Sequence, residues 1–151
     1  MPAEPARGAS AGAPLQHFEL AISITPDDLP EDRFNHHVNN ARYFAFINRT
    51  FHGWYVAMGL RGRLPDFSAV MAHCEYDFLR QVNYPGQVSC RIKVARAGRT
   101  SLEHAIEIWD VTGEPVLAGR GRAVHVGVDR ASGKPIAWPA SVLAQCWSPA
   151  D

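Results

Sequence analysis

The fold of this chain is most constrained by a periodic pattern of apolar residues from Asn40 to about Met58. The stretch holds no proline and a single glycine, and large apolar side chains recur in it at spacings of three or four: Tyr43, Ile47, Phe51, Trp54 and Met58. This spacing predicts one long helix, with Gly59 as its C-terminal stop. Because further apolar residues lie off this stripe, we expect other structure to wrap the helix: Phe44, Phe46 and Tyr55.

Alternating apolar and polar residues predict five strands around this helix. One strand precedes the helix, at His17–Ile24, and four follow it, at 70–78, 88–94, 102–108 and 116–128. Turn residues separate the later strands, as in Ala97-Gly98-Arg99 and Thr112-Gly113. The order of strand, helix and a meander of four strands predicts an α+β fold, with one long helix covering an antiparallel sheet.

Length and composition narrow the class of protein. The 151 residues suit one domain, expected at 15–145, after a disordered N-terminal tail at 1–14. Fifteen basic residues balance fifteen acidic ones, which argues against a nucleic-acid partner. No signal-like segment or bilayer-length apolar run is present, so no membrane association is expected. Three scattered cysteines favour a reducing, cytoplasmic setting: Cys74, Cys90 and Cys146.

The segment from Asn35 to Tyr43, where a loop leads into the helix, is mostly polar and contains the candidate functional residues. In one interpretation Asn39 or Asn40 caps the helix, and His36 and His37 bind loop carbonyl groups. In the other, free backbone N–H groups at the helix start polarise a carbonyl oxygen, as an oxyanion site requires. Composition alone leaves both interpretations open.

His37-Val38-Asn39-Asn40 followed by Ala41-Arg42-Tyr43 resembles the signature of the hot-dog thioesterases related to 4-hydroxybenzoyl-CoA thioesterase. Residues 78–82, 97–101 and 126–135 resemble later parts of that family, and the likeness covers about Phe18 to Val142. It implies a hot-dog fold, with one long central helix wrapped by a five-stranded antiparallel sheet. It also implies hydrolysis of an acyl-CoA thioester to free acid and CoA, without a cofactor, in a homodimer or homotetramer whose site is composite.

The resemblance also implies roles for single residues. The thioester carbonyl would point at the helix start, where the donating amide maps near Asn40, and a loop carboxylate would act as base or nucleophile. An ungapped match puts Arg33 where many relatives have Asp, but an insertion would let Asp32 take that place, with Glu31 as second choice. His37 is a further catalytic candidate, to orient water or serve as the base.

The substrate-binding residues expected from this match are Asn39 and Tyr43 at the helix start, and Arg99 and Ser101 in and after a predicted turn. Three histidines and one cysteine are metal-ligand candidates by residue type, but their spacing matches no familiar zinc pattern, so no metal is expected: His36, His37, His73 and Cys74. The alternative function is a non-catalytic acyl-CoA or acyl-carrier binding protein. It is motivated by Arg33 and by Asn48, which stands where a helix Glu is common in the family. A hot-dog dehydratase ranks last.

Overall fold

The computed structural model describes residues 17–31, 35–60 and 64–146. The predicted tail at 1–14 and the candidate base Asp32 lie outside these residues. The elements run in the order β1 (His17–Ser23), a 3-10 turn η1 (Pro26–Asp28), α1 (Asn40–Ala57), β2 (Phe67–Phe78), β3 (Gln87–Ala97), β4 (Ser101–Asp110), β5 (Val116–Asp129) and α2 (Ala140–Cys146). The predicted long helix and five strands are therefore confirmed, with bounds that differ by a few residues.

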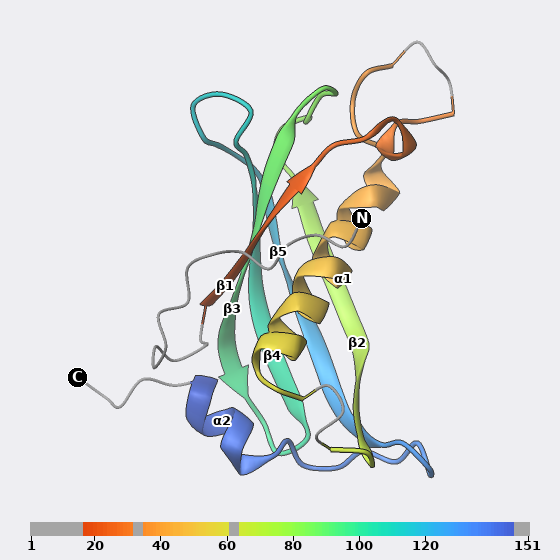
Figure 1. Cartoon of the computed structure of the whole chain (residues 1–151), viewed down its shortest axis with the longest axis vertical. Helices are drawn as coiled ribbons and strands as arrows, with labels where there is room; N and C mark the ends of the chain where they lie inside the picture. Colours follow the sequence, from red (N-terminus) through yellow and green to blue (C-terminus); the bar gives the residue numbers. More distant parts are fainter. Residues whose placement is uncertain (1–16, 32–34, 61–63, 147–151) are drawn as a thin grey trace, which may run out of the picture.

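The strands form one antiparallel sheet in the order β1-β3-β4-β5-β2, and α1 runs diagonally across one face of it (Figure 1). This arrangement confirms the α+β hot-dog fold. The four-strand meander was wrong in one respect, because only β3, β4 and β5 follow one another in the sheet. Strand β2 pairs with β5 at the sheet edge, and β3 lies between β1 and β4. Periodicity identifies strands, but it does not say which of them pair.

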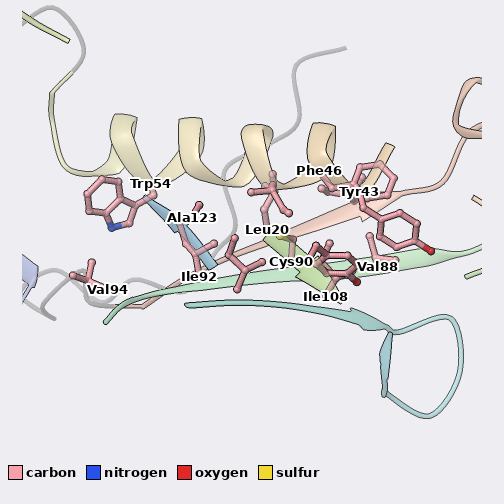
Figure 2. Close-up of a cluster of buried hydrophobic side chains, with 14 of the residues drawn as sticks. Leu20, Tyr43, Phe46, Trp54, Val88, Cys90, Ile92, Val94, Ile108 and Ala123 are labelled. Carbon is pink, nitrogen blue, oxygen red and sulfur yellow. The ribbon is translucent and has the colours of Figure 1, made fainter. Parts of the chain in front are cut away.

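The core lies between α1 and the sheet face beneath it. Figure 2 shows Tyr43, Phe46 and Trp54 pointing from α1 toward the sheet, and all three are buried. Residues from three strands meet them from the other side: Leu20, Val88, Cys90, Ile92, Val94 and Ile108. The helix ends as predicted, because Gly59 has a φ of 73° and its N–H donates to the Val56 carbonyl at 2.9 Å.

A β-bulge divides β2 into two halves. The pairing of β2 with β5 shifts register between Met71 and His73, so Ala72 has no paired residue. The uniform alternation predicted for this strand is therefore wrong, because the extra residue changes which side chains face α1. Val70 is exposed, whereas Tyr76 is buried on the helix side of the sheet.

The C-terminal helix α2 was not predicted. Val142 and Cys146 are its buried residues and belong to the core. Just before it, Trp138 donates a hydrogen bond from its indole N–H to the Thr100 carbonyl at 3.1 Å, which fastens this end of the chain to the turn between β3 and β4. Across the described ranges, no helix is long and apolar enough to cross a bilayer.

Candidate functional site at the start of helix α1

The first turn of α1 is capped by Asn39. The side-chain oxygen of Asn39 accepts a hydrogen bond from the Ala41 N–H at 3.1 Å, and its backbone carbonyl accepts one from the Arg42 N–H at 2.9 Å. Asn39 has extended backbone angles, φ −60° and ψ 135°, as expected of an N-cap residue. Asn39 is therefore the cap, and Asn40 is the first helical residue.

Asp28 joins the loop to this first turn. Its carbonyl accepts a hydrogen bond from the Asn39 N–H at 2.8 Å, and its carboxylate accepts one from Arg42 Nε at 2.8 Å. The other carboxylate oxygen accepts one from the Thr25 N–H at 2.8 Å. The Asp28 side chain is 4% exposed. Sequence reasoning missed this residue, although Thr25 followed three residues later by an acid is the spacing of a capping box.

A second contact holds the same loop to the segment between β2 and β3. The Val38 N–H donates to the Val82 carbonyl at 2.8 Å, and the Tyr84 N–H donates to the His36 carbonyl at 2.7 Å. His37 and Asn83 form an isolated antiparallel bridge between these bonds. Since Val38 and Val82 are both buried, the entrance to α1 is fixed from two sides.

Among the described residues, the backbone N–H of Asn40 at the helix start has no hydrogen-bond acceptor. By contrast, the N–H groups of Asn39, Ala41 and Arg42 all have acceptors. Asn40 is also exposed. A free N–H at the positive end of an 18-residue helix is suited to bind an anion or a developing oxyanion. The role of the Asn40 N–H as oxyanion donor stays a prediction, and this exposed amide is available for it.

The structure gives less information on the positions of the other predicted catalytic residues. Asp32 lies outside the described residues, and Glu31, the second choice, is exposed on the loop. His37 is half-buried at its bridge with Asn83, on the loop that leads into α1. Helix α1 carries no carboxylate, and Asn48 is exposed on it. Within the described ranges, no three histidine, cysteine or acidic side chains gather in a way that could hold a metal ion.

Of the predicted substrate-binding residues, Asn39 and Tyr43 lie at the helix start. Tyr43 is buried, and burial raises the pKa of its phenol. Arg99 and Ser101 lie instead at the turn between β3 and β4, to which Trp138 is hydrogen-bonded. Figure 2 shows Val94, near the end of β3, below Trp54 of the second half of α1. A single chain therefore does not bring Arg99 and Ser101 together with Asn40.

Two histidines are buried beneath the second half of α1. His104 of β4 packs edge-on against Trp54, with ring centroids 4.7 Å apart, and His125 of β5 stacks on Phe51 at 3.4 Å. Neither ring nitrogen of His104, nor Nδ1 of His125, has a hydrogen-bond partner among the described residues. Burial lowers the pKa of His104 to about 3, helped by the neighbouring His125, and lowers the pKa of His125 to about 4.

Solved structures share this fold over most of the chain. The PA2801 protein of Pseudomonas aeruginosa superposes with a TM-score of 0.76 at 21% identity, covering 84% of this chain and 95% of its own. A 4-hydroxybenzoyl-CoA thioesterase mutant complexed with 4-hydroxybenzoyl-CoA gives 0.77 at 15% identity, covering 87% and 99%. A 1,4-dihydroxy-2-naphthoyl-CoA thioesterase from Synechocystis gives 0.74 at 14% identity, covering 86% and 95%. Likenesses at these identities establish the fold alone.

Sequence comparison assigns the family. No curated protein sequence matches the chain. The sequence model of the thioesterase-like superfamily, however, matches residues 26–146, which include the η1 turn, the helix start and every later element. The chain therefore belongs to the thioesterase-like superfamily and is a thioester hydrolase of the hot-dog fold.

Proposed function

We propose that this protein hydrolyses an acyl-CoA thioester to the free acid and CoA, with the Asn40 N–H as oxyanion donor. The observation that carries the proposal is the Asn40 N–H at the start of α1, which has no acceptor among the described residues. In this account the N–H donates to the thioester oxygen as negative charge develops on it. The cap at Asn39 and the Asp28–Arg42 contact hold this amide in place, so little reorganisation is needed when the charge forms.

The thiol carrier is proposed to be CoA. Two structures of the same fold support this choice, because one is a complex of 4-hydroxybenzoyl-CoA thioesterase with 4-hydroxybenzoyl-CoA and another, from Staphylococcus aureus, is a complex with CoA. CoA arrives and leaves as part of the substrate and product, so no separate cofactor is required. Arg99 offers an exposed cation for a phosphate group. Ser101 stands beside it at the start of β4.

Water must be activated by a base, and a loop carboxylate is proposed for that step. Asp32 is the first choice and Glu31 the second, because both lie in the loop that leads to the helix start. His37 is the alternative base, since a neutral imidazole can accept a proton and this one is part of the same loop. Asn39 and Tyr43 complete the proposed site as substrate contacts on the cap and the first turn.

A second function is favoured by two features of the sequence. Helix α1 carries no carboxylate, and an ungapped match to the hot-dog thioesterases puts Arg33 where many of them have Asp. A chain without a placed base would bind acyl-CoA or an acyl carrier without cleaving it. The two functions differ in a single measurable property, the release of free thiol.

The experiment measures free thiol released from short, medium, long and aromatic acyl-CoAs by the wild type. Three variants accompany it, Asp32→Asn, Glu31→Gln and His37→Gln, with Asp27→Asn as an exposed loop acid for control. The proposal expects turnover by the wild type and the control, and at least a hundredfold loss in one of the three variants. If no substrate is turned over while acyl-CoA still binds in calorimetry, the binding protein is the better description.

We also propose that the working unit is a homodimer, or a pair of such dimers, with the substrate held between protomers. Strand β2 supports this, because it forms an edge of the sheet and carries apolar side chains in solvent. Val70 and Phe78 of this strand are each 46% exposed. An apolar sheet edge of this kind is ready to pair with a second copy. In such a dimer, residues remote from Asn40 within one chain could reach the partner's helix start.

A further inference from the structure

Three aromatic rings form a cluster beside the start of α1. Tyr43 of the first turn stacks on Tyr76 of β2 with ring centroids 5.4 Å apart, and it meets Phe78 edge-on at 5.2 Å. Tyr76 and Phe78 meet each other edge-on at 4.9 Å. Tyr43 is three residues after Asn40, which is about 4.5 Å along the helix axis. The cluster therefore lies within one helical turn of the proposed oxyanion donor.

The cluster contains one buried hydroxyl group without a hydrogen bond to any described residue. The Tyr76 hydroxyl is buried, in a residue that is 8% exposed, and it has no partner among the described residues. A hydroxyl removed from water without a partner costs free energy, so a phenylalanine would pack here more favourably. A polar group kept at such a place, next to a reaction site, points to a ligand that supplies the missing bond.

The sheet is shaped to accept this ring. Tyr76 pairs with Gly121 of β5, and its ring extends over Gly119, where a β-carbon would overlap the hydroxyl oxygen and the adjacent ring carbon. Gly119 pairs in turn with Phe78, whose position is nearer the end of β2. Because Gly119 has no side chain, it leaves room for the Tyr76 hydroxyl near the end of β2, where Phe78 lies.

The cluster opens to solvent on one side. Tyr43 and Tyr76 are buried, whereas Phe78 is 46% exposed at the sheet edge formed by β2. In the proposed dimer this edge faces the second protomer, so a ligand held between the protomers would pass Phe78, and its far end would meet the Tyr76 hydroxyl. Burial also raises the pKa of the Tyr76 phenol, so this group stays protonated and can donate at neutral pH.

We propose that the Tyr76 hydroxyl is a specificity-determining contact that donates a hydrogen bond to an oxygen of the acyl group, so that the enzyme prefers acyl-CoAs bearing a hydroxyl or keto oxygen to their plain hydrocarbon counterparts. The inference rests on the proposed function and adds the chemical class of the acyl group to it. The aromatic rings around the hydroxyl contribute apolar contact to both kinds of substrate, so the discrimination depends on the one polar bond.

The test compares matched pairs of substrates in the wild type and in Tyr76→Phe, which removes the hydroxyl oxygen and keeps the ring. The pairs are butyryl-CoA with 3-hydroxybutyryl-CoA and acetoacetyl-CoA, and benzoyl-CoA with its ring-hydroxylated forms. We expect kcat/KM for an oxygenated member to fall about tenfold or more, with its plain counterpart changed less than about twofold. Tyr55→Phe, about three turns along the helix, is the matched control and should change neither.

Binding separates this inference from the proposed hydrolysis. Non-hydrolysable thioether analogues of the same acyl-CoA pairs would be titrated calorimetrically into the wild type and Tyr76→Phe. Tighter binding of the oxygenated analogue that disappears in Tyr76→Phe supports the Tyr76 contact even if no thioester is cleaved. A wild type with no preference in any pair, or a preference that Tyr76→Phe retains, overturns it.

Discussion

The Asp28 carboxylate accepts a hydrogen bond from Arg42 Nε at 2.8 Å, and this contact ties the loop before α1 to the first turn of the helix. The Asp28 side chain is 4% exposed and that of Arg42 is 42% exposed, so the acid is buried while the base still reaches solvent. The same aspartate accepts from the Thr25 N–H and, through its carbonyl, from the Asn39 N–H. One buried residue thus positions the cap on which the proposed oxyanion site depends.

Replacing this aspartate should destabilise the fold. Asp28→Ala removes the acceptor of a charged hydrogen bond and leaves the Thr25 N–H unpaired, which should cost about 2 kcal/mol in the free energy of unfolding. Urea titration measures the loss. The matched control is Asp27→Ala, because Asp27 is the exposed neighbour in the same turn. Equal unfolding free energies for the two variants would mean that the Asp28–Arg42 contact contributes nothing.

The capping role of Asn39 can be tested by two substitutions, one that removes the capping side chain and one that replaces it with another capping residue. Asn39→Ala removes the acceptor of the Ala41 N–H and should lower the free energy of unfolding by about 1 kcal/mol, whereas Asn39→Ser, with another good capping residue, should lose much less. Thermal unfolding of the three proteins gives the comparison. A serine variant as unstable as the alanine variant would contradict the capping role.

The buried histidine pair predicts loss of stability in mild acid. Their pKa values fall from 6.5 in ordinary surroundings to about 3 for His104 and about 4 for His125. Between these values and 6.5, the unfolded chain binds protons that the folded chain does not. Their contribution to stability is therefore complete only above about pH 7.5 and is lost as the pH falls through 6.5. Between pH 6 and pH 5 the two groups together give a slope of about 2 to 2.5 kcal/mol per pH unit.

Urea unfolding at pH 7.5, 6.0 and 5.0 measures this slope. The double variant His104→Leu with His125→Leu should lose most of it, whatever its stability at neutral pH. His52→Gln, which replaces an exposed histidine of α1, should leave it unchanged. A slope that survives in the double variant would assign the acid sensitivity to other groups.

The exposed edge strand predicts self-association. Light scattering on the eluting peak of a sizing column should give the mass of a dimer or a larger even assembly. Val70→Lys places a charge on the apolar edge of β2 and should shift the protein toward the monomer. A lysine at an exposed position of another element, as in Ala105→Lys on β4, is the control. A monomeric wild type would contradict the proposed assembly.

The fold could be predicted from sequence where the pattern is local. The spacing from Tyr43 to Met58 specifies a helix because every contact of that pattern is made within one element, and Gly59 marks its end for the same reason. The bulge at Ala72 and the place of β2 beside β5 depend on pairing with residues about fifty positions away. Helix α2 is too short to show a period of its own.

The candidate site was predictable to the same extent. The His37–Tyr43 motif located the helix start and its amide, because the motif and the cap are contiguous. The burial of Asp28 depends on Arg42, fourteen positions later in the chain, and the exposure of an acid cannot be read from its neighbours. The orphaned hydroxyl of Tyr76 arises from Tyr43 and Gly119, which lie on two other elements. These relationships exist only once the chain has folded.

The most direct test of the proposed mechanism removes a single hydrogen-bond donor, the Asn40 N–H, from the backbone. Proline is tolerated at the first position of a helix, and Asn39 already has the extended backbone that a following proline prefers. Asn40→Pro therefore deletes the proposed oxyanion donor and keeps the helix, while Asn40→Ala keeps the donor and deletes the side chain. Unfolding curves of both variants check that each is folded.

The measurement is the rate of thiol release, kcat, from the best acyl-CoA substrate by the wild type, Asn40→Ala and Asn40→Pro. We expect Asn40→Ala to stay within about fivefold of the wild type, and Asn40→Pro to lose about a hundredfold or more because one oxyanion donor is gone. A folded Asn40→Pro that hydrolyses the substrate as fast as Asn40→Ala would contradict the proposed mechanism, since the Asn40 N–H would then have no part in the reaction.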